Sequence, residues 1–207
     1  GLDFNFSQKI NNKISNLPIP IKIAFINKKG SFVKFSLNNS KYRYEHVYLL
    51  SKSHDKASVV CNEKEITPSI LRGFSAPVIL NTDIKINEYI HILKFDNDSF
   101  NKWDAAQNLY LNFFFKKINL NIFIKTLKEL ILEKKVNYSL MALLLELPSR
   151  TIFENLSNDA DPILIFKRKK DLMKTIGLGL KEVFEVNALE LYKSKIHIDK
   201  NFEKRLL

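Results

Sequence analysis

The run Leu71-Arg72-Gly73-Phe74-Ser75-Ala76-Pro77-Val78 lies where the pattern of apolar residues along this chain changes. Before it, apolar and polar residues alternate in short segments, as at Leu2, Phe4 and Phe6. After it, from Ser99 onward, apolar residues recur every three or four positions. Alternation is typical of half-buried strands, and the longer period is typical of helices. The sequence therefore predicts a β region followed by an α region.

Short strands separated by turn-forming residues favour a β-sandwich for the first part of the chain. Lys28-Lys29-Gly30 is a turn signal, and Lys52-Ser53-His54-Asp55-Lys56 is predicted to be a hairpin loop. Pro68 and Pro77 cannot donate a ladder hydrogen bond, so we expect them at strand starts, edges or bends. The predicted strands cover residues 2–6, 21–25, 32–35, 44–49, 57–61, 69–73 and 76–80.

The period becomes helical after about Thr82, which predicts a β domain over residues 1–82 and an α domain over residues 83–207. A short helix is expected around Ile90 and Leu93. A longer helix is expected up to Ile118, with Ser99 as its N-cap. Three further helices are predicted over residues 122–131, 138–146 and 149–156, the second of them capped by Asn137.

The last long helix has the strongest start signal, because Asp161 is a good N-cap and Pro162 tolerates the first helical position. It is predicted to run to Leu191, with a bend or break near Gly177, since glycine costs about 1 kcal/mol relative to alanine inside a helix. Asp199 is predicted to cap a final short helix that the end of the sequence cuts off.

The composition is that of a globular protein with a sizeable core. The chain has 207 residues, of which 45% are hydrophobic, and a formal net charge of +11. The lysines are dispersed, and Lys167-Arg168-Lys169-Lys170 is the only dense cluster, so nucleic-acid binding is disfavoured. The single cysteine, Cys61, forms no intrachain disulfide and is expected to be a buried small hydrophobe. We expect a reducing, cytoplasmic location, with no signal peptide and no membrane segment.

The residues offer no catalytic or metal-binding pattern. The four histidines are His46, His54, His91 and His197, and no two are four residues apart, so the zinc motif H-E-x-x-H is missing. Gly177-Leu178-Gly179 lacks the preceding strand and the third glycine of a dinucleotide loop. We therefore predict no catalytic, no metal-binding and no substrate-binding residue, and no cofactor held by this chain.

Two runs resemble sequence marks of the zinc-dependent alanyl aminopeptidases, the aminopeptidase N family of gluzincins. They are the run at residues 71–78 and Phe100-Asn101-Lys102-Trp103-Asp104-Ala105-Ala106-Gln107. Leu147-Pro148-Ser149 and Asp161-Pro162-Ile163 follow in the family's order, and the resemblance covers essentially the whole chain. It implies an immunoglobulin-like β-sandwich followed by the start of a superhelical α domain, both from the family's non-catalytic C-terminal half.

This resemblance implies a role for a larger parent protein. The parent would remove N-terminal residues from peptides with a bound zinc, and this chain would support and enclose that site without being an enzyme itself. Its partners would be the catalytic domain of the same polypeptide and the parent's peptide substrates. The alternative is a free-standing sandwich-plus-helix binding module, with a basic surface for an acidic protein or a nucleic acid.

Four residues are candidates for the junction between the two domains: Arg72, Trp103, Asp104 and Gln107. Arg72 stands beside a glycine just before the end of the β region, where it could bridge the sandwich and the helices. Trp103 has a large apolar area, and Asp104 and Gln107 share a helix face. Ordinary packing at the junction is the favoured interpretation of these residues, ahead of direct contact with substrate.

The ends of the sequence suggest a cut from a larger protein, because it begins without Met and stops in a helix. Helices in a superhelix bury faces on both neighbours, so the last helices would lack their successors. We therefore expect self-association, as an artefact of the cut, through apolar residues of the C-terminal helices. These residues are Phe166, Met173, Phe184, Leu189 and Phe202.

Overall fold

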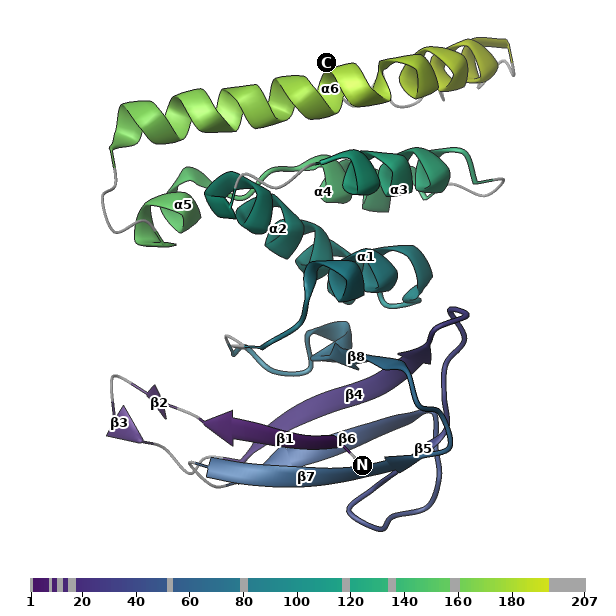
Figure 1. Ribbon diagram of the computed structural model, residues 1–207, viewed down its shortest axis with the longest axis vertical. Coiled ribbons are helices and arrows are strands. Elements are labelled where there is room, and N and C mark those ends of the chain that lie inside the picture. Colours follow the sequence, from purple (N-terminus) through teal and green to yellow (C-terminus); the bar gives the residue numbers. More distant parts are fainter. Residues whose placement is uncertain are drawn as a thin grey trace, which may run out of the picture. The chain divides into compact units, whose positions relative to one another are not determined.

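The computed structural model describes residues 2–7, 9–10, 13–14, 18–51, 54–78, 82–116, 120–133, 137–156 and 161–193. Strands occupy the chain up to residue 70 and α-helices follow from residue 86 (Figure 1). The predicted order, a β region and then an α region, is confirmed. The described residues form two compact units, one within Gly1–Ile118 and Asn137–Ser149 and the other within Asn119–Val136 and Arg150–Leu207.

The first unit contains two antiparallel three-stranded sheets that form a sandwich (Figure 1). One sheet has the order β1-β7-β5, and the other has the order β6-β4-β8. A two-stranded ribbon, β2-β3, lies beside them. The bounds are β1 Leu2–Ser7, β2 Lys9–Ile10, β3 Lys13–Ile14, β4 Ile19–Asn27, β5 Phe35–Leu37, β6 Glu45–Leu50, β7 His54–Cys61 and β8 Ile66–Ile70.

The sandwich core lies between the sheets and follows the predicted alternation. Ile21, Ile23 and Phe25 of β4 are buried in one cluster with apolar residues of β5 and β7. The rings of Phe25 and Phe35 meet edge to face, with centroids 4.7 Å apart. The predicted turn after Asn27 is confirmed, and β8, which contains Pro68, is an edge strand as Pro68 requires.

Strand β4 is buried on both faces, which is unusual for a sandwich strand with one side in water. Ala24 and Ile26 point away from the sandwich core, and yet they are as fully buried as their neighbours. Helix α1 (Ile86–Phe95) packs beside β8, and a 3₁₀ turn, η1 (Arg72–Phe74), packs on β4. The outer face of this sheet is therefore covered by the segments that follow it in sequence.

Two more helices complete the first unit: α2 (Ser99–Lys116) packs on α1, and α4 (Tyr138–Leu145) packs on α2. The predicted cap of α4 is confirmed, because the Asn137 side chain accepts a hydrogen bond from the Leu140 N–H. At the other end of α4, the Tyr110 hydroxyl donates to the Leu144 carbonyl over 2.8 Å. Since helix ends leave backbone groups without partners, this bond fixes α4 on α2.

The second unit consists of α3 (Asn121–Ile131), α5 (Arg150–Leu156) and α6 (Pro162–Lys193). The predicted start of α6 is confirmed, since the Asp161 carboxylate accepts a hydrogen bond from the Ile163 N–H. Helix α6 packs on both α3 and α5. Its buried side is one apolar stripe, formed by Ile165, Leu172, Ile176, Leu180 and Val183.

Several local predictions are wrong. Residues 76–78 are not a strand, because η1 turns the chain out of the sheet (residues 79–80 lie outside the described part). Within the described part of the chain, the last strand of the sandwich is Ile66–Ile70 rather than residues 69–73. His54–Lys56 belong to β7 and not to a hairpin loop, because they pair with residues of β1 far away in sequence. The predicted loop residues 52 and 53 are outside the described part.

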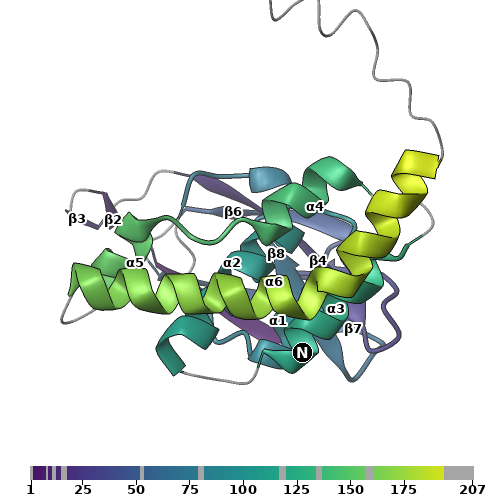
Figure 2. The same ribbon diagram turned by 90° about the horizontal axis from the view of Figure 1, so that it is seen from above.

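Two predictions about helix ends and breaks are also corrected. Asp98, not Ser99, caps α2, since the Asp98 carboxylate accepts a hydrogen bond from the Asn101 N–H. Helix α6 is continuous through Gly177, so of the two predicted alternatives the break is wrong, whereas a bend agrees with Figure 2, which shows the helix changing direction in its C-terminal part. The predicted cap Asp199 and Phe202 lie outside the described residues.

The two glycines of α6 have opposite surroundings, and this generates the first prediction. A Cβ added at Gly179 would lie 2.8 Å from Ile124 Cγ2 on α3, whereas a Cβ added at Gly177 would meet nothing within 4 Å. Gly177→Ala should raise the free energy of unfolding by roughly 0.5–1 kcal/mol, because alanine favours the helix. Gly179→Ala should lower it by about 1 kcal/mol or more, because overpacking outweighs that gain. Urea denaturation of both variants tests this pair, and equal shifts would contradict the close approach.

Candidate functional site

The backbone turn at the end of the sandwich determines where the Arg72 side chain lies. Three residues around it, Leu71, Gly73 and Phe74, have positive φ angles of 63°, 59° and 51°. For non-glycine residues this left-handed conformation is uncommon and must be stabilised by the surroundings. The turn ends β8 and brings the guanidinium into the interior, where the Arg72 side chain is only 9% exposed.

Arg72 joins the sandwich to the loop between α1 and α2 through four hydrogen bonds. Its Nε donates to Glu45 Oε2 on β6 over 2.8 Å. Its Nη1 donates to Ser69 Oγ on β8 and to Asp96 Oδ1, each over 2.8 Å. Its Nη2 donates to Asn97 Oδ1. The Phe32 ring lies 4.9 Å from the guanidinium carbon, which adds a cation–π contact.

Asp96 is the buried anion of this cluster, with a side chain that is 0% exposed. Besides Arg72, it accepts hydrogen bonds from the Ser69 hydroxyl over 2.6 Å and from the Asp98 N–H over 2.9 Å. The Asn101 side-chain amide donates to Ser69 Oγ over 2.6 Å, which links α2 to the same point. Burying a charge is costly unless it is paired and hydrogen-bonded, and here both conditions are met.

The Asp98 carboxylate makes a second connection between η1 and α2, by accepting hydrogen bonds from backbone N–H groups of both. One carboxylate oxygen accepts a hydrogen bond from the Gly73 N–H of η1 over 2.7 Å, and the other caps α2. The joint, by which we mean Glu45, Ser69, Arg72, Asp96, Asn97, Asp98 and Asn101, thus connects two strands, one 3₁₀ turn and two helices. Only Arg72 of this set was among the sequence candidates. The polar triplet Asp96-Asn97-Asp98 between two helical stripes is the signal that could have revealed the others.

The other junction candidates lie farther along α2. The Trp103 ring packs against the Phe100 ring, with centroids 5.7 Å apart, and the Phe100 ring packs against the exposed ring of Phe74, with centroids 5.1 Å apart. We call these three rings the aromatic row. Gln107 donates from its side-chain amide to the Glu146 carbonyl just beyond α4 over 2.9 Å. Asp104 accepts a hydrogen bond from the Asn108 side chain on the exposed side of the same helix. The structure therefore does not bring the four candidates together: Arg72 is in the joint, Trp103 is in the aromatic row, and Gln107 contacts α4.

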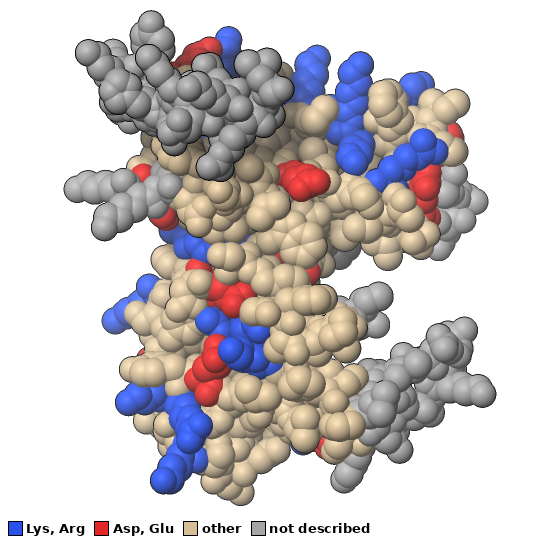
Figure 3. All heavy atoms as spheres, turned by 180° about the vertical axis from the view of Figure 1, so that it is seen from behind, with Lys and Arg blue, Asp and Glu red and all other residues tan. Residues whose placement is uncertain are grey.

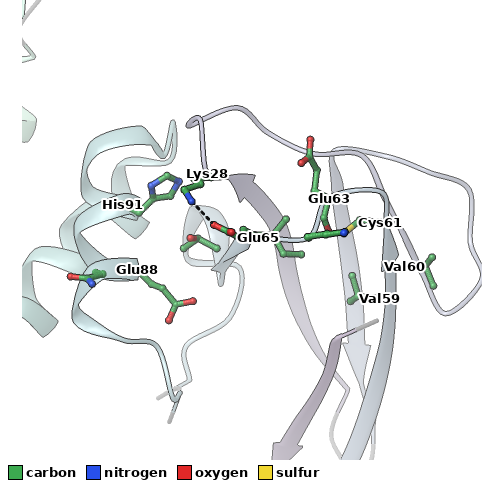
Figure 4. A pocket seen from close by; sticks show the side chains of 12 residues that line it. Lys28, Val59, Val60, Cys61, Glu63, Glu65, Glu88 and His91 are labelled. Atoms are coloured by element: carbon green, nitrogen blue, oxygen red, sulfur yellow. Dashed lines mark hydrogen bonds and ion pairs between the residues drawn. The ribbon is translucent and has the colours of Figure 1, made fainter.

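A cavity of about 690 Å³ opens between α1 and the connection from β7 to β8. Figure 4 shows Glu88 and His91 on α1, facing the ion pair of Lys28 and Glu65. Its polar groups have structural partners: the Glu88 carboxylate accepts from the Lys85 N–H, and the His91 ring donates to the Asn27 carbonyl. The Cys61 thiol, half-buried rather than buried, donates to the Glu63 carbonyl. These contacts stabilise the fold, and no nucleophile–base pair is formed by the labelled residues.

The part of the chain that the structure describes does not fit a zinc ion. None of its His, Cys, Asp and Glu residues form a group of three or more that could hold a metal. No helix among the described residues is long and apolar enough to cross a membrane. On the face shown in Figure 3, Lys and Arg are spread over several elements with Asp and Glu between them, and they do not form one basic surface. The joint is therefore the most elaborate polar arrangement among the described residues.

Comparisons with known proteins agree with this architecture. A family model described as "Domain of unknown function (DUF3458) Ig-like fold" matches residues 2–83, and one described as "Domain of unknown function (DUF3458_C) ARM repeats" matches residues 86–206. The chain is 32% identical over 95 residues to aminopeptidase N of Haemophilus influenzae, covering 46% of this chain and 11% of that protein. It is 25% identical over 155 residues to aminopeptidase N of Escherichia coli, covering 68% of this chain and 17% of that protein.

A solved structure has the same fold. It is a crystal structure of Legionella pneumophila aminopeptidase A in complex with aspartic acid, with a TM-score of 0.74 and 20% sequence identity. The match covers 92% of this chain and 22% of that one.

An immunoglobulin-like sandwich followed by ARM-type helices is thus the class that the fold defines. The chain belongs to the DUF3458 family and corresponds to the C-terminal region of the M1 aminopeptidases, as its resemblance to aminopeptidase N predicted.

The joint generates a prediction about stability. Arg72→Met leaves the Asp96 carboxylate buried without its cation, and removing one partner of a buried pair costs about 3–5 kcal/mol. The matched control is Arg150→Met, because the pair of Arg150 with Glu154 on α5 lies at the surface, where such a pair is worth roughly 0–1 kcal/mol. Denaturant unfolding followed by tryptophan fluorescence measures both variants. Equal, small losses would contradict the importance of the joint.

Because of Glu45, the stability of the fold should depend on pH. Partial burial raises the pKa of Glu45, but hydrogen bonds from Arg72 and Lys22 outweigh this effect and hold the pKa below its ordinary value of 4.5. The folded state then binds this proton less readily than the unfolded chain, so stability is fully present above about pH 4.5 and declines as the pH falls through the lowered pKa. Glu45→Gln should flatten this decline. A variant with the same acid profile as the wild type would disprove the assignment.

Proposed function

We propose that this chain is a non-catalytic support for the active site of a zinc aminopeptidase, which removes N-terminal residues from peptides. The proposal is supported by membership of the DUF3458 family and by the relatives, which are named aminopeptidase N. The chain spans only 11–17% of the length of the curated relatives that it matches. In this proposal the zinc and the reacting groups are held by another part of the polypeptide, and the catalytic domain of that polypeptide is the main partner.

The joint is the observation that carries this role. A support must place helices at a fixed position on a rigid base, and side chains are best positioned by elements whose own geometry is locked. Arg72, Asp96 and Asp98 lock the start of α2 onto the sandwich through charge-assisted bonds, of which the one between Arg72 and Asp96 is buried. Helix α2 in turn positions α4 through Tyr110 and Gln107. The helices of the first unit are therefore fixed to the sheet edge by polar bonds of defined direction.

A chimaera tests the supporting role. The aligned region of Escherichia coli aminopeptidase N is replaced by this chain, and hydrolysis of an alanyl chromogenic substrate is measured together with zinc content. We expect activity within about tenfold of the relative, and a clear fall in kcat with Arg72→Met, because a misplaced support disturbs active-site geometry. This chain alone should carry no stoichiometric zinc and should release no product.

The controls separate folding from function. Circular dichroism and zinc content establish that the chimaera is folded and loaded. A folded, zinc-loaded chimaera that is no more active than the relative with this region deleted would contradict the proposal. One tightly bound zinc in this chain alone would contradict it as well.

A second candidate function is a binding module for an acidic partner. One observation favours it: Lys167, Lys170 and Lys174 are exposed on α6 with spacings of three and four residues, which is one face of a helix. Binding to a short DNA duplex or an acidic peptide that disappears with Lys167→Glu and Lys170→Glu would favour this function. Binding that these changes leave intact would count against it.

A further inference from the structure

The cavity between α1 and the connection from β7 to β8 has one buried polar side chain in its lining, that of Thr67. This residue lies on β8 and is only 9% exposed. Its hydroxyl is the exception among the polar groups described above, because no residue in the described part of the chain forms a hydrogen bond with it. Side chains buried to this degree normally have a partner, so the Thr67 hydroxyl indicates a place for a bound group.

Two side chains of α1 face the same cavity, and each has one acceptor that no described residue uses (Figure 4). Glu88 accepts from the Lys85 N–H through Oε2, which leaves its Oε1. His91 Nε2 lies 2.8 Å from the Asn27 carbonyl oxygen, which can only accept, so Nε2 is the donor and Nδ1 of the neutral ring is an acceptor. Glu88 and His91 are three positions apart and therefore share one face of α1. We call Thr67, Glu88 and His91 the acceptor triad.

The charges of the cavity favour a cation. On the side opposite α1, Lys28 and Glu65 form an ion pair over 3.0 Å, and Glu63 and Lys64 are neighbours of opposite charge. Glu88 on α1 is then the charge that remains. An anion is disfavoured at the start of α1, because the Glu88 carboxylate already accepts the N–H of the N-cap residue there.

We propose that this cavity binds a primary ammonium group, as it occurs at a peptide N-terminus or on a lysine side chain. An ammonium group has three N–H donors and no acceptor, which matches the three acceptors of the triad. Its bond to the Glu88 carboxylate is charge-assisted and is the strongest of the three. The volume of about 690 Å³ leaves room for the chain that carries the ammonium group, and Val59 and Ile66 provide an apolar wall for it.

Hydrogen bonding, and not charge alone, should select the ligand. A trimethylated ammonium group has the same charge but no N–H donor, so it cannot satisfy the buried Thr67 hydroxyl. An acetylated amine has lost the charge and cannot pair with Glu88. Both changes leave the rest of the molecule intact, and both should therefore weaken binding.

Titration of the full chain with small amines, followed by NMR chemical shifts, tests the proposal. The two probes are trialanine amide, which has a free N-terminus, and N-acetyl-lysine methylamide, which has a free side-chain amine. At least one should shift the backbone signals of the triad residues, with a dissociation constant on the order of 1 mM. N-acetyl-trialanine amide and the trimethylated lysine probe should bind at least about tenfold more weakly. The probe that binds more tightly identifies the source of the ammonium group.

Substitutions in the triad separate binding from folding. Thr67→Val keeps the shape of the side chain but removes the hydroxyl, so it should weaken amine binding by at least about tenfold. It should leave the thermal unfolding temperature unchanged or raised, because a buried hydroxyl without a partner is unfavourable. Glu88→Gln keeps an acceptor for the Lys85 N–H and removes the charge, and it should weaken binding similarly. Glu182→Gln, at an exposed position of α6, is the matched control and should leave binding unchanged.

Several results would overturn the proposal. One is the lack of saturable binding of either amine up to about 20 mM, well above the expected dissociation constant. Another is equal binding of the acetylated and the free probes, or binding that both Thr67→Val and Glu88→Gln leave intact. A lower unfolding temperature for Thr67→Val would also contradict it, because the hydroxyl would then have a structural partner.

Discussion

The buried ion pair of Arg72 and Asp96 is the interaction on which the first unit depends. Both charges are buried away from water, and the cost of desolvating them is offset only if hydrogen bonds satisfy both groups. Ser69, Asn97, Asp98 and Asn101 supply that set, and they come from a strand, a loop and a helix. None of these partners can move alone without leaving a buried polar group unpaired. The pair therefore fixes where the chain leaves the sandwich and where α2 begins.

Apolar packing also makes the sandwich and the segments that follow it, η1 and α1, depend on each other. Ala24 and Ile26 on the outer face of β4 are buried only because η1 and α1 cover that side of the sheet. Without this cover, the sandwich would expose an apolar strip along its central strand. Hydrophobic burial holds the helices against the sheet without fixing a direction, and the ion pair supplies the direction. A supporting role next to an active site requires that combination, because a support must be both attached and oriented.

Much of the fold could be predicted from local pattern. Alternation located the strands around Phe25, and Asn137 and Asp161 marked helix starts, because these signals act over a few residues. The errors arose where distant contacts decide the structure. Residues 54–56 form a strand because β1 pairs with them, and residues 76–78 leave the sheet because three left-handed residues turn the chain. The hydrogen-bond partners of Arg72 were missed for the same reason, since they are 3 to 27 positions away and no local motif links them.

A double-mutant cycle between Arg72 and Asp96 tests the central claim most directly. The free energy of unfolding is measured for Arg72→Met, for Asp96→Asn and for the double variant. If the two charges stabilise each other as the structure indicates, the coupling energy should be at the upper end of roughly 0.5–3 kcal/mol found for contacting residues. The double variant should then be hardly less stable than either single one. Losses that simply add, with a coupling energy near zero, would contradict the claim that this pair holds the first unit together.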